Sequence, residues 1–192
     1  MNIGVLALQG GYQAHINVLN TLGVYCSLVR ERQTLDASDA LIIPGGESST
    51  LIQLLKTQQL WTPLKEYNKP IFGTCAGAIL LAKSVLSPAQ ESLSRINIRA
   101  IRNAYGRQRA SHVVQGHCIV NNTTLEMVFI RAPKFQLLSP VTLKILATYQ
   151  EEVVAVQENN VIAASFHPEL SHDHYLHRYF IQQVGCSTAT AF

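Results

Sequence analysis

Two short segments carry residue types that could do covalent chemistry, and the first is built around Cys75. This cysteine follows the apolar run Pro70-Ile71-Phe72 and precedes a helix-like stretch from Ala76 to Lys83. The layout predicts a nucleophile elbow, a tight turn from strand to helix, in which the start of the helix favours the reactive thiolate. Gly73 and Gly77 permit the strained backbone and the close packing that such a turn needs.

The second segment, Phe166-His167-Pro168-Glu169, supplies a base and a carboxylate. Pro168 biases His167 toward an extended conformation, so His167 and Glu169 can lie near each other at the end of a strand. A nucleophile, a base and an orienting carboxylate make a Cys75-His167-Glu169 triad. A lone cysteine is more often a small buried hydrophobe, and a lone histidine an ordinary loop residue. The elbow glycines and the His-Pro-Glu triplet together favour the catalytic interpretation.

The composition indicates a chain that can bury a large hydrophobic core. Of the 192 residues, 47% are hydrophobic and 14% charged, and the net charge of +3 comes without a long basic run. These values predict a single α/β domain over residues 1–192 and argue against nucleic-acid binding. We also expect no membrane span and no signal peptide, because no apolar stretch is long enough to cross a bilayer and no basic segment opens the chain.

The four cysteines are widely spaced and form no C-x-x-C pair. This spacing fits neither a zinc site nor a disulfide scaffold, and we expect no metal and no cofactor. A histidine cluster at His172, His174 and His177 lacks the cysteine or carboxylates that a metal site would add. A reducing, cytoplasmic setting follows, which a thiol nucleophile would also need.

The first half of the chain alternates buried strands with helices, which predicts a three-layer, flavodoxin-like fold with a mostly parallel sheet covered on both faces. Strands are expected at 3–8, 24–29, 40–43 and near Ile71, and helices at 12–22, from a cap at Ser48 or Ser49, and at 61–67. In such sheets ligands bind beyond the carboxyl ends of the strands. Three loops should therefore converge there, carrying Gln9, the Gly45-Gly46-Glu47 turn and Cys75.

The second half predicts short antiparallel hairpins, with turns at Asn121-Asn122 and Asn159-Asn160. Strands are expected at 96–100, 114–120, 127–130, 143–148, 153–157 and 161–165. A last helix is expected at 173–184, followed by a frayed tail at 187–192.

These residues would suit hydrolysis of a carboxamide. Cys75 can attack the carbon after His167 takes its proton, and the backbone N–H groups of Ala76 and of the Gly45-Gly46 turn could bind the oxyanion. Glu47 could bind an ammonium group, or could be an ordinary first-turn helix carboxylate. The remaining histidines are expected to be surface or partly buried groups, and they are His15, His112, His117, His172, His174 and His177.

The elbow and the His-Pro-Glu triplet resemble those of class I glutamine amidotransferases. Longer strings are similar to the family of glutaminase subunits of pyridoxal 5'-phosphate synthase across nearly the whole chain. They are Gly4–Gly10 (GVLALQG), Ile43–Thr50 (IPGGESST), Arg102–Gln108 (RNAYGRQ), Phe129–Pro133 (FIRAP) and Ser165–Leu170 (SFHPEL).

The resemblance implies the triad of Cys75, His167 and Glu169. It also implies L-glutamine contacts from Gly45, Gly46, Glu47, Arg102, Ile130 and Arg131, and a role for Gln9 near the oxyanion site and the partner interface. The family hydrolyses L-glutamine to glutamate and ammonia through a thioester, and passes ammonia to a barrel-shaped synthase subunit that makes pyridoxal 5'-phosphate. The stretch Arg109–Val113 departs from the family pattern, but no departure touches the triad.

Two other interpretations remain open. The chain could be a non-catalytic scaffold that keeps the fold and only binds a partner, although the intact triad argues against this. It could also be an amidotransferase that feeds a different acceptor, although the strings at 102–108 and 129–133 argue against that.

Overall fold

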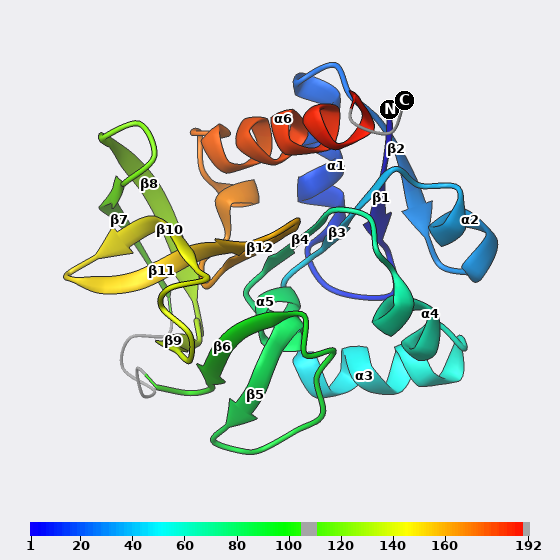
Figure 1. The fold of residues 1–192 in the computed structure, drawn as a ribbon, viewed down its shortest axis with the longest axis horizontal. Coiled ribbons are helices and arrows are strands. Elements are labelled where there is room, and N and C mark those ends of the chain that lie inside the picture. The colour runs from blue at the N-terminus through cyan, green and yellow to red at the C-terminus, as the bar shows by residue number, and fades with distance from the viewer. Residues whose placement is uncertain (105–110, 190–192) are drawn as a thin grey trace.

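Four strands of the amino-terminal half and one near the carboxyl terminus form the parallel part of a large sheet (Figure 1). The computed structural model describes residues 1–104 and 111–189. Across the sheet, the parallel strands lie in the order β2 (Tyr25–Val29), β1 (Asn2–Leu6), β3 (Ala40–Ile43), β4 (Ile71–Thr74) and β12 (Val161–Ala164). The predicted class of fold, an α/β fold of the flavodoxin-like type, is confirmed.

The antiparallel strands extend this same sheet beyond β12. They do not form short hairpins separate from it. They are β11 (Glu152–Glu158), β10 (Lys144–Tyr149), β7 (Ser111–Cys118) and β8 (Thr123–Ile130). Asn122 and Asn159 have φ values of 55° and 53°, which asparagine tolerates well in tight turns. Both predicted turn positions are therefore confirmed.

Helices cover both faces of the parallel strands, because alternate residues of each strand face opposite sides. One face packs against α1 (Tyr12–Thr21) and α6 (Tyr175–Ala189). The other face packs against α2 (Arg32–Asp36), α3 (Ser48–Thr57), α4 (Trp61–Glu66) and α5 (Ala76–Leu81). Across the described residues, no helix combines the length and the apolar character needed to span a bilayer.

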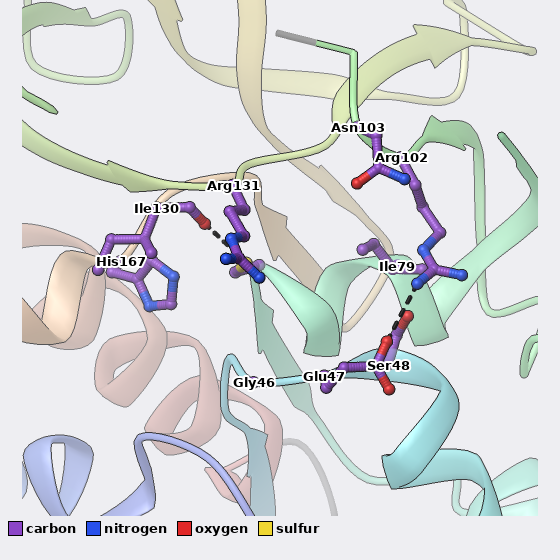
Figure 2. Close-up of a pocket in the computed structure, with 10 residues that line it drawn as sticks. Gly46, Glu47, Ser48, Ile79, Arg102, Asn103, Ile130, Arg131 and His167 are labelled. Carbon is purple, nitrogen blue, oxygen red and sulfur yellow. Dashed lines mark hydrogen bonds and ion pairs between the residues drawn. The ribbon is translucent and has the colours of Figure 1, made fainter. Parts of the chain in front are cut away.

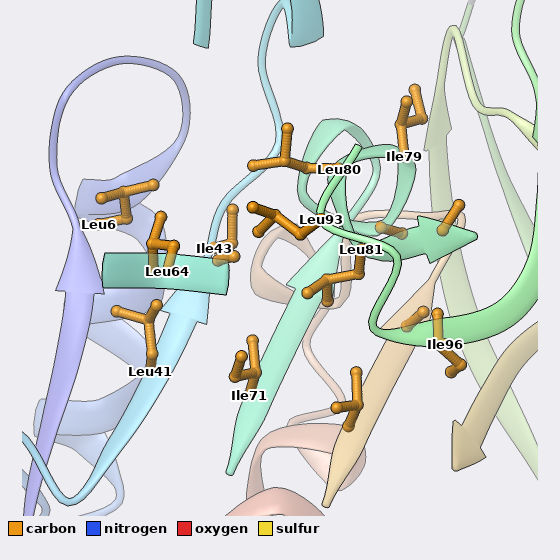
Figure 3. Close-up of a cluster of buried hydrophobic side chains, with 14 of the residues drawn as sticks. Leu6, Leu41, Ile43, Leu64, Ile71, Ile79, Leu80, Leu81, Leu93 and Ile96 are labelled. Atoms are coloured by element: carbon orange, nitrogen blue, oxygen red, sulfur yellow. The ribbon is translucent and has the colours of Figure 1, made fainter. Parts of the chain in front are cut away.

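Aliphatic side chains make up most of the core on the second face (Figure 3). Leu41, Ile43 and Ile71 rise from neighbouring strands and meet Leu64 of α4 and Leu81 of α5, all of them without solvent exposure. Burying one such side chain stabilises a fold by about 1.5–3 kcal/mol. This packing fixes the ends of the strands, and with them the loops that follow.

A second, smaller sheet lies below the first in Figure 1 and contains β5 (Ala82–Leu86), β6 (Ile96–Ile101) and β9 (Lys134–Leu137). The predicted helix from Ala76 to Lys83 is wrong at its end. It stops at Leu81, because Ala82 turns to an extended conformation (ψ 148°) and β5 pairs with β6. At the other end of the chain, α6 continues to Ala189, into the segment 187–192 that was expected to be frayed; residues 190–192 lie outside the described part.

Candidate active site

Four loops meet beyond the carboxyl ends of the parallel strands. Gln9 follows β1, Gly45 follows β3, Cys75 follows β4 and His167 follows β12. Because β3, β4 and β12 are neighbours in the sheet, their ends place these loops side by side. A methyl group built on Gly45 would lie 2.3 Å from Cε1 of His167 and 3.2 Å from Cβ of Cys75. Only glycine fits at this position between Cys75 and His167.

Cys75 lies in the strained turn that the sequence predicts between β4 and α5. Its φ and ψ are 47° and −104°, an uncommon conformation for a residue with a side chain. The turn is fixed on both sides: the Cys75 amide donates to the Ala164 carbonyl at 2.8 Å, and the Cys75 carbonyl accepts from the Ile79 amide at 3.0 Å. These bonds hold the thiol at the start of α5, where it donates weakly to the Ile130 carbonyl at 3.7 Å.

The glycines of the elbow permit its close packing. A Cβ on Gly77 would lie 2.0 Å from the Ile43 carbonyl oxygen, and a Cβ on Gly73 would lie 2.7 Å from the Gly77 carbonyl carbon. Both contacts are with backbone, which cannot move aside as the end of a side chain can. The first turn of α5 therefore packs directly against the backbone of β3 and β4.

We expect Gly77→Ala to destabilise the protein by about 2–4 kcal/mol, since overpacking a rigid contact forces the backbone to shift. Urea unfolding would measure this loss. Gly185→Ala in α6 is the matched control, because a Cβ there meets no atom within 4 Å and alanine favours a helix by about 1 kcal/mol. Equal stability of Gly77→Ala and the wild type would contradict the proposed tight packing of the elbow.

His167 and Glu169 meet at hydrogen-bond distance in the interior. His167 Nδ1 lies 2.8 Å from Glu169 Oε1, and the side chains are 10% and 1% exposed. Glu169 belongs to the short helix η2 (Pro168–Leu170), and the His167 amide donates to the Val128 carbonyl at 2.8 Å. An ionised carboxylate can only accept hydrogen bonds, so Nδ1 carries a proton and Nε2 is left for Cys75.

Burial and charge act in opposite directions on this pair. Burial disfavours an imidazolium, but hydrogen bonds to Cys75 and Glu169 outweigh it and raise the pKa of His167 to about 10. Burial likewise opposes the charged form of Glu169, yet His15 and His167 hold its pKa well below the usual range. The setting therefore favours a protonated His167 beside the Glu169 carboxylate.

A pocket of about 350 Å³ opens in front of the thiol, within the range for small-molecule sites. Figure 2 shows His167 on one side, Arg102 and Asn103 on the other, and Glu47 below. Seven of the residues singled out in the sequence line it, namely Gly46, Glu47, Cys75, Arg102, Ile130, Arg131 and His167. Three further lining residues were not predicted as site residues, namely Ser48, Ile79 and Asn103.

Glu47 has two roles in the structure. It is the N-cap of α3, because Oε2 accepts from the Thr50 amide at 2.7 Å and from the Ser49 hydroxyl at 2.6 Å. The predicted cap at Ser48 or Ser49 is therefore wrong, and a carboxylate takes the position because it can accept both bonds at once. Burial opposes ionisation, but these bonds bring the pKa of Glu47 down to about 2. Its Oε1 pairs with Arg102 at 3.0 Å.

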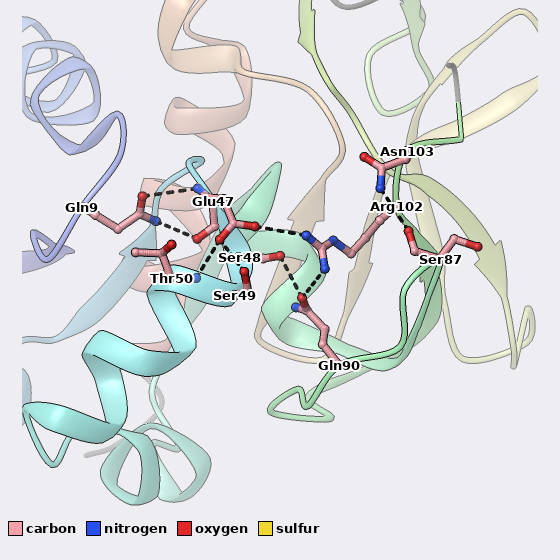
Figure 4. Close-up of polar contacts among 9 residues, drawn as sticks. All are labelled: Gln9, Glu47, Ser48, Ser49, Thr50, Ser87, Gln90, Arg102 and Asn103. Carbon is pink, nitrogen blue, oxygen red and sulfur yellow. Dashed lines mark hydrogen bonds and ion pairs between the residues drawn. The ribbon is translucent and has the colours of Figure 1, made fainter. Parts of the chain in front are cut away.

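The Arg102 guanidinium is held from two sides (Figure 4). One terminal nitrogen donates to Glu47 and the other to Oε1 of Gln90 at 2.8 Å, an oxygen that also accepts from the Ser48 hydroxyl at 3.0 Å. Gln90 was not singled out in the sequence, since no motif marks it. In contrast, no hydrogen bond or ion pair among the described residues engages the side chain of Arg131 at the pocket.

Gln9 holds the turn that follows β3. Its side chain accepts from the Glu47 amide at 3.2 Å and donates to the Glu47 carbonyl at 3.4 Å (Figure 4). A Cβ on Gly46 would lie 2.5 Å from the Gln9 Oε1, so the two residues are in close contact. The Gly45 carbonyl accepts from the Gly11 amide at 3.0 Å. Because N–H and C=O of one trans peptide point in opposite directions, the Gly46 N–H points away from Gly11.

The histidines outside the triad divide into two groups. His112, His117, His172 and His174 are exposed or half-buried, as expected. The expectation is wrong for His15 and His177, which have no solvent exposure. These two lie on the inner sides of α1 and α6, where helical spacing alone does not distinguish a buried polar residue from an exposed one.

Comparison with known proteins places the site in a class. A solved structure described as a glutamine amidotransferase superposes with a TM-score of 0.88 at 39% identity, covering 95% of this chain and 98% of that one. The fold is thus that of a class I glutamine amidotransferase.

The particular family follows from the sequence comparisons. The chain belongs to the SNO glutamine amidotransferase family, whose model matches residues 5–186. It is 44% identical to the pyridoxal 5'-phosphate synthase subunit PdxT of Thermosipho africanus, covering 96% of this chain and 99% of that protein. It is also 44% identical to PdxT of Koribacter versatilis, and this match covers 96% of each chain. Residues 105–108 of the string at 102–108 lie outside the described part of the structure.

Proposed function

We propose that the chain hydrolyses L-glutamine with the triad of Cys75, His167 and Glu169, and that it supplies ammonia to a pyridoxal 5'-phosphate synthase subunit. The observation that carries the proposal is the alignment of a thiol in a strained elbow, a histidine that lines the same pocket, and a buried carboxylate 2.8 Å from that histidine. The similarity to PdxT proteins supplies the acceptor pathway.

The reaction begins with attack of the Cys75 sulfur on the carboxamide carbon. A C–S bond forms and the carbonyl oxygen takes up negative charge. His167 then gives its proton to the amide nitrogen, the C–N bond breaks, and ammonia leaves a thioester on Cys75. Water attacks the thioester while His167 accepts its proton, the C–S bond breaks, and glutamate departs. Throughout, Glu169 stabilises the imidazolium and fixes its orientation.

Charged groups at the far side of the pocket suit the amino-acid end of glutamine. We assign the α-ammonium group to the Glu47 carboxylate, which stays ionised at neutral pH because of its low pKa of about 2. The α-carboxylate would lie toward Arg131, with Arg102 held close by through Glu47 and Gln90. The arrangement selects a substrate that carries both an α-ammonium and an α-carboxylate group, with a carboxamide about three carbons away from the carbon that bears them.

We expect Arg131→Ala to raise the KM for glutamine by about ten- to hundredfold, because a charge-assisted contact with a carboxylate contributes about 1.5–3 kcal/mol. The kcat should change much less, since the reacting groups are untouched. Steady-state glutamate release would separate the two constants. Arg32→Ala, on α2 and paired with Asp36, is the control and should leave both unchanged. A lower kcat at unchanged KM would contradict the binding role.

The oxyanion site is the part of the mechanism that we connect to the partner. The amide of Ala76 opens α5, where helix amides have no carbonyl partner within the helix, and Gly46 offers a second N–H. The turn that carries Gly46 is held by Gln9 and by Gly11. A synthase subunit that docks beside Gln9 could change the orientation of this turn and complete the oxyanion site, because glycines allow a peptide to rotate.

We therefore expect the isolated chain to hydrolyse glutamine slowly and to gain about 10²-fold or more in kcat when the synthase subunit is added, as for the loss of one oxyanion donor. Glutamate release, measured with and without the synthase, tests this and the proposed function together. Gln9→Ala should weaken the activation, whereas Gln13→Ala on the exposed side of α1 should not. Full activity of the chain alone, unchanged by the synthase, would contradict the proposed coupling.

A non-catalytic scaffold would bind the synthase and release no glutamate, so the same assay distinguishes that alternative. An amidotransferase with another acceptor would release glutamate without activation by this synthase. We place the complex in the reducing cytoplasm, because the mechanism needs Cys75 as a thiol and no disulfide links the cysteines that the structure describes.

A further inference from the structure

Two buried histidines extend the triad into the core, and the reaction described above does not use them. His15 of α1 and His177 of α6 are both without solvent exposure, and His15 Nδ1 lies 2.9 Å from His177 Nε2. The other nitrogen of His15, Nε2, lies 3.1 Å from the Thr74 hydroxyl, with which it is hydrogen-bonded. It also lies 3.4 Å from Oε2 of Glu169, within ion-pair distance of a buried oxygen that has no hydrogen-bond partner in the described structure. The pair therefore contacts the carboxylate of the triad and also the residue that precedes the nucleophile.

The proton on His15 Nε2 can be assigned from its contacts. The Glu169 carboxylate is 1% exposed and can only accept, so a lone pair on His15 Nε2 would repel it, whereas an N–H would be attracted. His15 Nδ1 and His177 Nε2 are 2.9 Å apart, so one of these two nitrogens donates and the other accepts. The other nitrogen of His177, Nδ1, has no hydrogen-bond partner in the described structure.

The charges around the pair support a neutral His177. Burial, followed by the effect of His15, holds the pKa of His177 well below the usual range, and His174 and Arg178 act in the same direction. Glu169 opposes them. A neutral His177 can donate to His15 or accept from it at their 2.9 Å separation.

We propose that His15 is a positioning residue for the triad: its Nε2–H attracts the second oxygen of Glu169 at ion-pair distance, and the contact with His177 orients the His15 ring. Each oxygen of the carboxylate then has its own histidine, since Oε1 meets His167 and Oε2 meets His15. Rotation of the carboxylate would break both contacts at once. His167 is thereby held in one orientation toward Cys75, and the Thr74 contact ties the same unit to the strand that carries the nucleophile. The inference rests on the proposed triad.

The direct test is His15→Phe, which keeps a ring in the core and removes the donor. We expect kcat for glutamine hydrolysis by the chain with its synthase subunit to fall about ten- to hundredfold, as for other orienting partners, with KM within about twofold. The basic limb of the pH–rate profile should move to lower pH, because a less well-held carboxylate stabilises the His167 imidazolium less. His15→Gln, which can offer an amide N–H, should recover part of the loss, and His177→Phe should produce a smaller loss of the same kind.

Phe180→Leu is the matched control. Phe180 packs on Phe72, as His177 does, with ring centroids 5.6 Å apart in both cases, and it has no polar group to offer Glu169. This variant should lose stability without moving the pH profile. An equal loss of kcat in Phe180→Leu, or an unchanged kcat and pH profile in His15→Phe, would overturn the proposal.

A second measurement separates this inference from the glutaminase itself. Peptide mass spectrometry can follow alkylation of Cys75 by iodoacetamide against pH in the chain alone, without any glutamine turnover. The pH at which the imidazolium loses its proton should shift downward in His15→Phe and stay unchanged in Phe180→Leu. If the wild type hydrolyses glutamine and Cys75→Ala does not, the triad stands, and an unshifted alkylation profile in His15→Phe would overturn the positioning role only.

Discussion

Replacement of Cys75 by alanine is expected to lower glutamine hydrolysis by at least about 10⁴-fold, even in the presence of the synthase subunit. Loss of a nucleophile removes the covalent route altogether, and what remains is the small effect of binding and of the oxyanion donors. The side chain is 5% exposed and loses one sulfur atom, so the cost in stability should be near 1 kcal/mol and the fold should persist. Glutamate release and urea unfolding measure the two effects separately.

Cys26→Ser is the control for this substitution. Cys26 lies on β2, is partly exposed and does not line the pocket. It should keep wild-type activity. Appreciable hydrolysis by Cys75→Ala in the complex would contradict the role of Cys75, since no other cysteine of the described structure lines the site.

The second large effect is expected for Glu169→Gln, with a loss of about 10²- to 10⁴-fold in kcat and little change in KM. The amide keeps the size of the side chain but removes the charge that stabilises the imidazolium and orients Nδ1–H, as is known for an aspartate-to-asparagine change in a serine protease triad. The glutamine amide also has an N–H group in place of one carboxylate oxygen. This donor would face the nitrogens of His15 and His167 that now surround the carboxylate. The pH–rate profile of the variant should show an imidazolium that deprotonates at lower pH.

Glu47→Gln provides the contrast, because it removes a carboxylate from the same pocket but at the substrate-binding end. It should mainly raise KM, whereas Glu169→Gln should mainly lower kcat. The opposite assignment of the two effects would show that Glu169 contacts the substrate rather than His167.

Much of the parallel part of the sheet could be predicted from the sequence, because several of its strands are continuous apolar runs. The strand at 40–43 is such a run, and glycines follow it at positions 45 and 46. Elements that depend on distant partners could not be predicted in this way. β5 begins one residue after α5, and only its pairing with β6 explains why the helix ends at Leu81. β9 is four residues long and is likewise defined by its pairing with β6.

The same distinction holds at the site. The proposed triad carries local signals in the elbow glycines and in the His-Pro-Glu triplet, so its members can be predicted from the sequence. Gln90 comes near Arg102 only because the segment after β5 folds back over α3, and no spacing predicts that contact. His15 and His177 are 162 residues apart in the chain and meet only after α1 and α6 pack on the same face of the sheet. Their burial is a property of the tertiary structure.

The central claim, that glutamine is hydrolysed through a covalent bond to Cys75, is tested most directly by trapping the intermediate. The complex of this chain with its synthase subunit would be mixed with labelled L-glutamine, quenched in acid during turnover and digested for peptide mass spectrometry. We predict a glutamyl thioester on the peptide that contains Cys75, and none on the peptides that contain Cys26, Cys118 or Cys186. Turnover of glutamine with no adduct on Cys75 in the wild type, or an adduct at another residue, would contradict the proposed mechanism.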